Sequence, residues 1–211
     1  MEIDAFLFDL DGVITDSSTA HFKAWKAVAN SYGIDLPDSL EVSLKGISRR
    51  NSVEKIVQYA NIDLSEDAKQ AFMDTKNAMY QDLVAEYNPD NLLPGVQTIL
   101  EFARAHSIKI GLVSASKNAV PLIEALKIKA FFDVIVDPAK HPSKPAPDLF
   151  LAAAKRLGVA PENCVAFEDA IAGVQAIKAA GMTAIGIGER LDADYVFADL
   201  TAAHAMLETH V

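Results

Sequence analysis

Two aspartates follow a short apolar segment near the start of the chain, in the sequence Phe8-Asp9-Leu10-Asp11-Gly12-Val13. The apolar segment predicts a buried strand, and ligands bind beyond the carboxyl ends of the strands in a parallel sheet. On a continuing strand both aspartates would point to the same face, and Gly12 would let the chain turn sharply behind them. A lone Asp-x-Asp is more often a solvated turn, but the apolar strand and the motifs below favour carboxylates that do chemistry.

A second acidic pair, Glu168 and Asp169, ends another apolar run at residues 164–167. Placed beside the first pair, it would complete a cluster of four carboxylates. Such a cluster repels itself unless a hard cation lies within it, and ligand sets made of oxygen alone suit Mg2+. The two pairs therefore predict a magnesium site, in preference to the simpler interpretation of an acidic loop.

Two further segments could bind and neutralise an anion. In Ser114-Ala115-Ser116-Lys117-Asn118 a predicted strand meets a predicted helix, which would gather a hydroxyl, backbone N–H groups and a helix N-terminus. Taken alone, that segment is better explained as a helix capped by Ser116. In Ser143-Lys144-Pro145-Ala146-Pro147-Asp148 two prolines hold the loop behind Lys144. A lysine there can neutralise a phosphoryl group in transfer, and the company of the other motifs sets it apart from a solvated surface lysine.

The elements that must position these residues fall into two groups. Apolar runs predict strands at residues 3–10, 109–114, 132–136, 164–167 and 183–187. In the second half of the chain these strands alternate with helix-like stretches at residues 96–105, 119–126, 147–157 and 170–180. This alternation indicates a parallel sheet covered on both faces. Residues 16–92 contain helical patterns, at 18–32, 52–60 and 66–86, and no convincing strand. The expected fold is α/β, with a core of residues 1–15 and 93–211 and a helical insertion of residues 16–92.

Composition narrows the class of protein. The 211 residues carry a formal net charge of −10, which argues against nucleic acid and anionic membrane as partners. An anionic substrate would then need a local patch of lysine and arginine. The single cysteine, Cys164, cannot form an internal disulfide, and we expect it to be a buried residue at the start of a strand. With no signal-like start and no apolar run long enough to span a bilayer, the expectation is a cytoplasmic globular protein.

The four motifs, in this order and spacing, resemble those of the haloacid dehalogenase superfamily of phosphotransferases. The helical insertion directly after the first motif is similar to the cap of the β-phosphoglucomutase branch of that superfamily. Its segments His21-Phe22-Lys23-Ala24-Trp25 and Leu44-Lys45-Gly46-Ile47-Ser48-Arg49 resemble the hinge-helix and substrate-loop motifs of the branch. The resemblance implies a Rossmann-like parallel sheet core with an inserted α-helical cap domain. It also implies that the strands ending at Asp9 and Asp169 lie side by side.

The resemblance implies a mechanism as well. The Asp9 carboxylate would attack phosphorus and form an aspartyl phosphate, while Asp11 would protonate the leaving oxygen and deprotonate the incoming hydroxyl. One Mg2+ would be held by the Asp9 carboxylate, the Asp11 carbonyl and the Asp169 carboxylate. The implied supporting residues are Glu168 beside the cation, Lys144 opposite the oxyanions, and Ser114 and Ala115 as donors. A second aspartate favours phosphate chemistry over dehalogenation, because a carbon–halogen bond offers no oxygen that needs its proton.

For the substrate, the resemblance implies interconversion of β-D-glucose 1-phosphate and glucose 6-phosphate. The intermediate would be β-glucose 1,6-bisphosphate, which turns around between a catalytic and a distal phosphate position. Arg49 would grip the distal phosphate bidentately and so provide the local basic patch. The other implied substrate contacts are Ser116, Lys117 and Asn118 at the distal phosphate, Lys45 and Gly46 at the sugar, and Thr15, His21, Trp25, Ser52 and Lys76.

Several alternatives stay open. His21 and Trp25 share a helix face, and without the resemblance they would be a surface histidine and a cap-core residue. The same scaffold would serve a sugar-phosphate phosphatase, although His21, Lys45 and Arg49 together favour the mutase. A non-catalytic sugar-phosphate sensor would be expected to lose an acidic position or Lys144, and none is lost. A monomer is the default expectation for the oligomeric state.

Overall fold

The computed structural model describes residues 3–189 and 191–209. Within them, six strands form one sheet in the order β3-β2-β1-β4-β5-β6, and every strand pair is parallel. The strands are β1 (Ala5–Phe8), β2 (Lys109–Leu112), β3 (Val134–Ile135), β4 (Cys164–Glu168), β5 (Thr183–Ile187) and β6 (Tyr195–Phe197). The predicted parallel α/β core is confirmed, and β1 lies between β2 and β4 at its centre.

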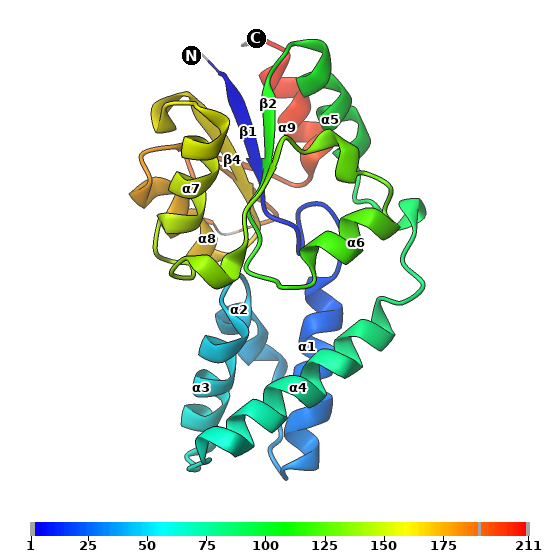
Figure 1. Cartoon of the computed structure of the whole chain (residues 1–211), viewed down its shortest axis with the longest axis vertical. Coiled ribbons are helices and arrows are strands. Elements are labelled where there is room, and N and C mark those ends of the chain that lie inside the picture. Colours follow the sequence, from blue (N-terminus) through cyan, green and yellow to red (C-terminus); the bar gives the residue numbers. More distant parts are fainter. Residues whose placement is uncertain (1–2, 190, 210–211) are drawn as a thin grey trace.

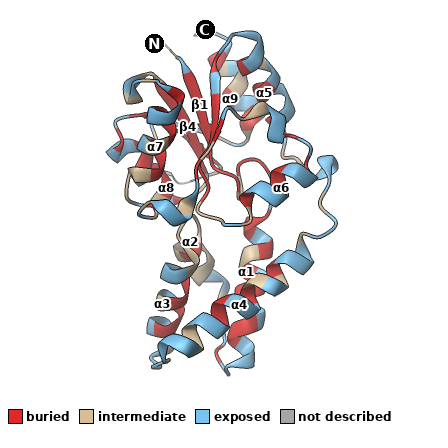
Figure 2. Cartoon of the chain, in the orientation of Figure 1, coloured by how far each residue is buried: buried red, intermediate tan, exposed pale blue. Residues whose placement is uncertain are grey.

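Helices cover both faces of this sheet, as its apolar strands require. They are α5 (Val96–Ala105), α6 (Ala119–Ala125), α7 (Asp148–Leu157), α8 (Ile171–Ala179) and α9 (Leu200–Leu207). Residues of β1 alternate between two buried clusters: Phe6 and Phe8 pack with α5, α6 and α9, while Ala5 and Leu7 pack with α7 and α8. The buried strands between exposed helix surfaces are visible in Figure 2.

Four helices form a separate group beyond the carboxyl ends of the strands, at the opposite end of the molecule from both termini (Figure 1). They are α1 (Ser18–Ser31), α2 (Glu41–Leu44), α3 (Arg49–Ala60) and α4 (Glu66–Leu83). Their apolar faces make a third cluster around residues such as Val28, Ile56 and Phe72. The side chains of Ser48 and Ser65 cap α3 and α4, which explains why α3 begins three residues before its predicted start.

Two chain segments connect this helical group to the sheet, and they are bound to each other. The Thr15 hydroxyl donates to the Asn91 carbonyl at 2.7 Å, and the Leu93 N–H donates to the Ile14 carbonyl at 2.9 Å. Thr15 is fully buried at this junction. The helices between the two segments are thereby anchored at one place on the core.

Some predicted elements differ in detail. The first strand ends at Phe8 rather than Leu10, so the expectation that Asp9 and Asp11 lie on one continuing strand is wrong. The chain turns instead, with Gly12 at φ +92° and an isolated bridge between Asp11 and Thr15. Strand β6 and helix α9 were not predicted as separate elements. In the described residues, no helix is long and apolar enough to cross a membrane.

Cys164 is buried as the first residue of β4, as expected. Burial raises the pKa of its thiol to about 11, so the group is protonated at neutral pH. The cysteine therefore serves packing rather than chemistry.

Candidate active site

The register of the central strands brings the two acidic motifs together. Phe8 of β1 pairs with Phe167 of β4, and the Asp9 N–H donates to the Phe167 carbonyl at 3.0 Å. Asp9 therefore leaves β1 where Glu168 ends β4. Carboxylate oxygens of Asp9, Glu168 and Asp169 lie within 4.8 Å of one another. The expected adjacency of the two strands is confirmed, but the group contains three carboxylates rather than the predicted four, because Asp11 is not part of it.

Lys144 binds two carboxylates of this cluster from the buried interior of the core. Its side chain is fully buried, and its Nζ donates to Asp9 Oδ1 at 2.6 Å, Glu168 Oε1 at 2.5 Å and the Val113 carbonyl at 3.0 Å. Burial lowers the pKa of this amine, but Asp9 and Glu168 outweigh burial and raise it overall. All three protons of a charged ammonium are thus used, which is the condition under which a buried charge is tolerated.

The carboxylates differ in their pKa values. Burial, partly offset by Lys144, raises the pKa of Asp9 to about 7, and the same two influences raise that of Glu168 to about 7. Burial and the Glu168 charge raise the pKa of Asp169 to about 7. Asp11 is the exception: burial raises its pKa, but His21 and Ser17 outweigh burial and lower it overall. Carboxylates whose pKa values are pushed apart suit different chemical roles.

The acidic cluster fits a divalent cation. Its donors are oxygens alone, the set that Mg2+ prefers. Lys144 binds two of the three carboxylates, and Lys45 Nζ lies 3.3 Å from Oδ2 of the third, Asp169. Space is reserved for the cluster, since a Cβ on Gly173 would lie 1.8 Å from Glu168 Oε1. Glu168 Oε2 also accepts the Ala170 N–H at 2.9 Å, which orients that carboxylate.

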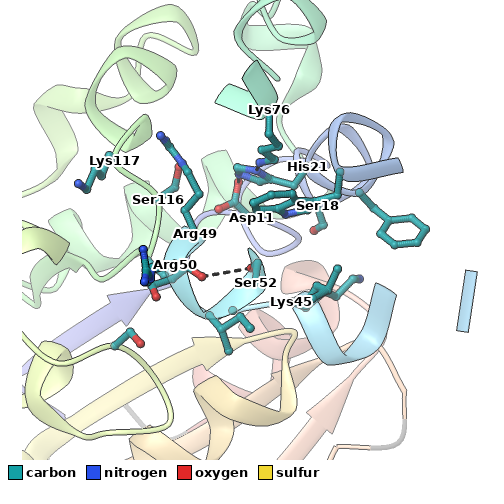
Figure 3. Close-up of a pocket in the computed structure, with 18 of the residues that line it drawn as sticks. Asp11, Ser18, His21, Lys45, Arg49, Arg50, Ser52, Lys76, Ser116 and Lys117 are labelled. Atoms are coloured by element: carbon teal, nitrogen blue, oxygen red, sulfur yellow. Dashed lines mark hydrogen bonds and ion pairs between the residues drawn. The ribbon is translucent and has the colours of Figure 1, made fainter. Parts of the chain in front are cut away.

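Asp11 lies at the end of a row of side chains from the helical group. Ser17 Oγ donates to Asp11 Oδ1 at 2.5 Å, and His21 Nε2 lies 3.4 Å from the same oxygen. On the other side of the ring, His21 Nδ1 contacts Lys76 Nζ at 2.5 Å. Figure 3 shows Lys76, His21 and Asp11 lying in this sequence. The row connects α4 and α1 to the loop that follows β1 at the carboxyl end of the sheet.

The ring of Tyr80 stacks on His21, with centroids 3.8 Å apart. Lys76 lies between two aromatic rings, 4.8 Å from the Trp25 centroid and 4.9 Å from the Tyr80 centroid. Burial and the nearby Arg49 charge lower the pKa of Lys76 to about 7. Burial likewise lowers the pKa of His21, so its ring is neutral and Nε2–H can donate to Asp11.

A cavity of about 350 Å³ lies between the helical group and the core; we call it the cap–core cavity. Asp9 and Asp11 line it from the core, and positive side chains line it mainly from the helices (Figure 3). Those positive residues are Lys45, Arg49, Arg50, Lys76 and Lys117, against the acidic residues Asp9, Asp11 and Glu41. The predicted local basic patch on an acidic protein is therefore present.

Most of the predicted substrate residues line this cavity: His21, Trp25, Lys45, Gly46, Arg49, Ser52, Lys76, Ala115, Ser116 and Lys117. Trp25 lines the cavity, as a substrate contact would, and it also belongs to the apolar cluster of the helices, as a core residue of the helical group would. Thr15, Ser114 and Asn118 are not among the lining residues. Thr15 is engaged at the junction with Asn91, and Ser114 Oγ accepts the Ser116 N–H at 3.0 Å.

Asn118 and Arg49 both donate to one residue that sequence reasoning missed. Asn77 Oδ1 accepts from Arg49 Nη2 at 2.6 Å and from Asn118 Nδ2 at 2.9 Å. The Asn77 side chain thus links α3 and α4 to the loop that precedes α6. Two other missed residues, Ser17 and Tyr80, surround Asp11 and His21. The four-residue spacing of Lys76 and Tyr80 on one helix face was the available signal.

Comparison with known proteins gives a consistent result. A family model for haloacid dehalogenase-like hydrolases matches residues 3–181. The chain is 45% identical to the β-phosphoglucomutase of Bacillus subtilis, over 88% of this chain and 83% of that protein. It is 34% identical to a fructose-1-phosphate phosphatase of Escherichia coli, over 86% of this chain and 94% of that protein.

Among solved structures, the crystal structure of a β-phosphoglucomutase from Clostridium difficile is 40% identical and superposes with a TM-score of 0.93. The match covers 98% of this chain and 96% of that one. The family model, the relatives and the shared architecture agree with the motifs at the carboxyl edge of the sheet. The chain therefore belongs to the haloacid dehalogenase-like hydrolase family.

Proposed function

We propose that this enzyme is a β-phosphoglucomutase that interconverts β-D-glucose 1-phosphate and glucose 6-phosphate through β-glucose 1,6-bisphosphate. The observation that carries the proposal is that Asp9 and Arg49 line one cavity of about 350 Å³. A bisphosphate can then place one phosphate at the nucleophile while an arginine on the opposite wall holds the other. Identity of 45% to a β-phosphoglucomutase over most of the chain supports this assignment.

In the proposed reaction an Asp9 oxygen attacks phosphorus, forms the P–O bond of an aspartyl phosphate, and releases the sugar oxygen. Lys144 offsets part of the rise in pKa that burial gives Asp9, and its hydrogen bond orients the carboxylate. Asp9, the Asp11 carbonyl and Asp169, supported by Glu168, would hold one Mg2+, which when bound offsets charge on the transferring phosphoryl group. Ser114 and Ala115 contribute donors from the loop after β2.

Asp11 moves the proton in both half-reactions. Its lowered pKa suits the step in which the sugar hydroxyl attacks the aspartyl phosphate, because Asp11 must then accept the hydroxyl proton. After that transfer the protonated Asp11 can return the proton to a leaving oxygen. His21 and Ser17 hold its carboxylate at the cavity wall during this exchange.

The distal phosphate is proposed to bind Arg49, Ser116, Lys117 and Asn118, with Lys45 and Gly46 at the sugar. Residues 16–92 would form a cap and residues 1–15 and 93–211 the core, with the junction at Thr15 and Asn91 as the place where they meet. A cap closed over the cavity excludes water, so the sugar hydroxyl rather than water accepts the phosphoryl group. The proposed assembly is a monomer acting on small phosphorylated sugars.

A second candidate, a sugar-phosphate phosphatase, is favoured by the 34% identity to a fructose-1-phosphate phosphatase. The two functions differ only in the phosphoryl acceptor. Reaction of β-glucose 1-phosphate with a trace of glucose 1,6-bisphosphate and Mg2+, followed by 31P NMR, separates them. The mutase predicts glucose 6-phosphate with little inorganic phosphate, whereas dominant inorganic phosphate would establish the phosphatase.

A further inference from the structure

A second cavity opens on the far side of the catalytic carboxylates; we call it the side cavity. Its volume is about 770 Å³, and residues of α2, the start of α8 and the loops after β1 and β5 line it. Asp169 lines the side cavity and not the cap–core cavity, whereas Asp9 and Asp11 line the cap–core cavity and not the side cavity. Ser18 and Lys45 line both, so they form the partition between them.

The two cavities differ in charge. The lining of the cap–core cavity carries five lysines and arginines against three carboxylates. The described lining of the side cavity carries one lysine against four carboxylates, which are Asp16, Asp169, Glu189 and Asp199. A cleft lined by one sign of charge raises the local concentration of the opposite ion and speeds its association. The cap–core cavity therefore favours a sugar phosphate, and the side cavity favours a cation.

Ser18 adds a polar group that has no other use among the described residues. Its side chain is 93% buried, at 7% exposure, and its Oγ has no hydrogen-bond partner. The place where a Cβ on Gly12 would stand is 2.8 Å from Ser18 Oγ and 2.1 Å from Asp169 Oδ2. Ser18 Oγ and Asp169 Oδ2 thus both lie close to the Cα of Gly12, where both residues line the side cavity, and Lys45 Nζ lies 3.3 Å from the same Asp169 oxygen. An unpaired buried hydroxyl there can bind a water carried by an entering cation, because Mg2+ keeps several of its waters.

We propose that hydrated Mg2+ reaches and leaves Asp169 through the side cavity, with the Ser18 hydroxyl contacting one of its waters. This inference rests on the magnesium site of the proposed function. Its consequence is that the cation can exchange while a sugar phosphate fills the cap–core cavity. Cation and substrate then have separate routes to one reaction centre.

The test compares single charge removals on the two cavities. Isothermal titration calorimetry gives the Mg2+ dissociation constant, and stopped-flow release into a fluorescent chelator gives the dissociation rate constant. Dividing the dissociation rate constant by the dissociation constant gives the association rate constant. We expect Asp199→Asn to lower that constant about threefold at low salt, with the difference vanishing at high salt. Asparagine can still accept the Ala202 N–H that Asp199 accepts, so α9 keeps its cap. Glu41→Gln removes one charge from the cap–core cavity and should leave the constant unchanged.

Ser18→Ala separates a role in cation entry from a structural role. We expect it to leave the free energy of unfolding in chelator equal or higher, since it removes an unpaired buried hydroxyl, yet to slow Mg2+ association. Unchanged association in both Ser18→Ala and Asp199→Asn would overturn the route while leaving the magnesium site intact. Calorimetry with no Mg2+ binding to the wild type would overturn the magnesium site and the route together.

Filling the cap–core cavity gives the decisive comparison. With saturating glucose 6-phosphate, we expect Mg2+ release to keep its rate within about twofold, because the side cavity stays open. Release slowed tenfold or more would place the exit through the cap–core cavity and overturn the proposal. If release keeps its rate in the wild type and is slowed by Ile171→Trp, the proposal is supported. Ile171 is half exposed and lines the side cavity but not the cap–core cavity.

Discussion

Two buried lysines, one in each region of the molecule, have opposite pKa shifts. Lys144 in the core is fully buried and binds Asp9 and Glu168, so its pKa is raised. Lys76 in the helical region is 2% exposed and lies between two aromatic rings, and burial together with the nearby Arg49 charge lowers its pKa to about 7. Burial lowers the pKa of both amines, so the charges of their neighbours decide the direction of the net shift.

The comparison separates the tasks of the two regions. In the core, the charge of Lys144 is paired with Asp9 and Glu168, which would hold the proposed nucleophile in place. Around Lys76, charge is conditional, because an anion entering the cap–core cavity would favour its protonated form. Under the proposed function, the core would supply the chemistry, and the helical region would supply groups whose charge can respond to the substrate.

The largest expected effect comes from changing Asp9, which raises the pKa of Lys144 and is the proposed nucleophile. Asp9→Asn should lower kcat for the mutase reaction by at least about 10⁴-fold, because the amide cannot form the aspartyl phosphate. Acid-labile phosphate on the protein, measured after exposure to a small phosphoryl donor and Mg2+, should disappear as well. Retention of more than a hundredth of wild-type turnover would refute the assignment of Asp9 as nucleophile.

Lys144→Met tests whether the core lysine is charged and needed. The change leaves Asp9 and Glu168 buried without their partner, so the free energy of unfolding should fall by about 3–5 kcal/mol at pH 8. Urea denaturation in chelator measures it. A smaller loss at pH 5.5 is expected, because the two carboxylates, with pKa values of about 7, are then already protonated. A variant as stable as wild type at both pH values would contradict the paired-charge interpretation.

Arg49→Ala acts on the helical side of the comparison. A charged hydrogen bond to the distal phosphate contributes about 1.5–3 kcal/mol, so kcat/KM for the mutase should fall by about 10- to 100-fold. Aspartyl-phosphate formation from a small donor with no distal phosphate should change little. Equal loss of both activities would exclude the distal-phosphate role. Asn77→Ala, which frees the guanidinium without removing it, should give a smaller loss of the same kind.

The smallest effect is expected from Lys76→Met, and it is a change in pH dependence. With a folded pKa of about 7 and an ordinary value of 10.5, Lys76 binds fewer protons in the folded than in the unfolded state between those limits. Its contribution to stability therefore rises as pH increases from 7 toward 10.5. We expect the methionine variant to be more stable than wild type at pH 7 and the gap to narrow by pH 9.5. A difference in the free energy of unfolding that stays constant with pH would mean that the pKa of Lys76 is not lowered in the folded protein.

The helices and strands that position the site were largely predictable because their signals are local. Apolar runs identified β1, β4 and β5, and turn residues identified the return to the sheet at Gly95. The positions at which elements end were less predictable. Strand β1 stops at Phe8 because its pairing with β2 and β4 ends there and the chain turns through Gly12, which only the assembled sheet imposes.

By itself, the sequence determined which residue types could do phosphoryl transfer, because the acidic pairs, the anion-binding segment and Lys144 each follow recognisable local patterns. Only the tertiary structure decided their partners: Lys144 between Asp9 and Glu168, Asn77 between Arg49 and Asn118, and Ser18 between two cavities. The reason is physical. Charge state, hydrogen bonding and access depend on burial and on neighbours distant in sequence, and the fold alone brings those together.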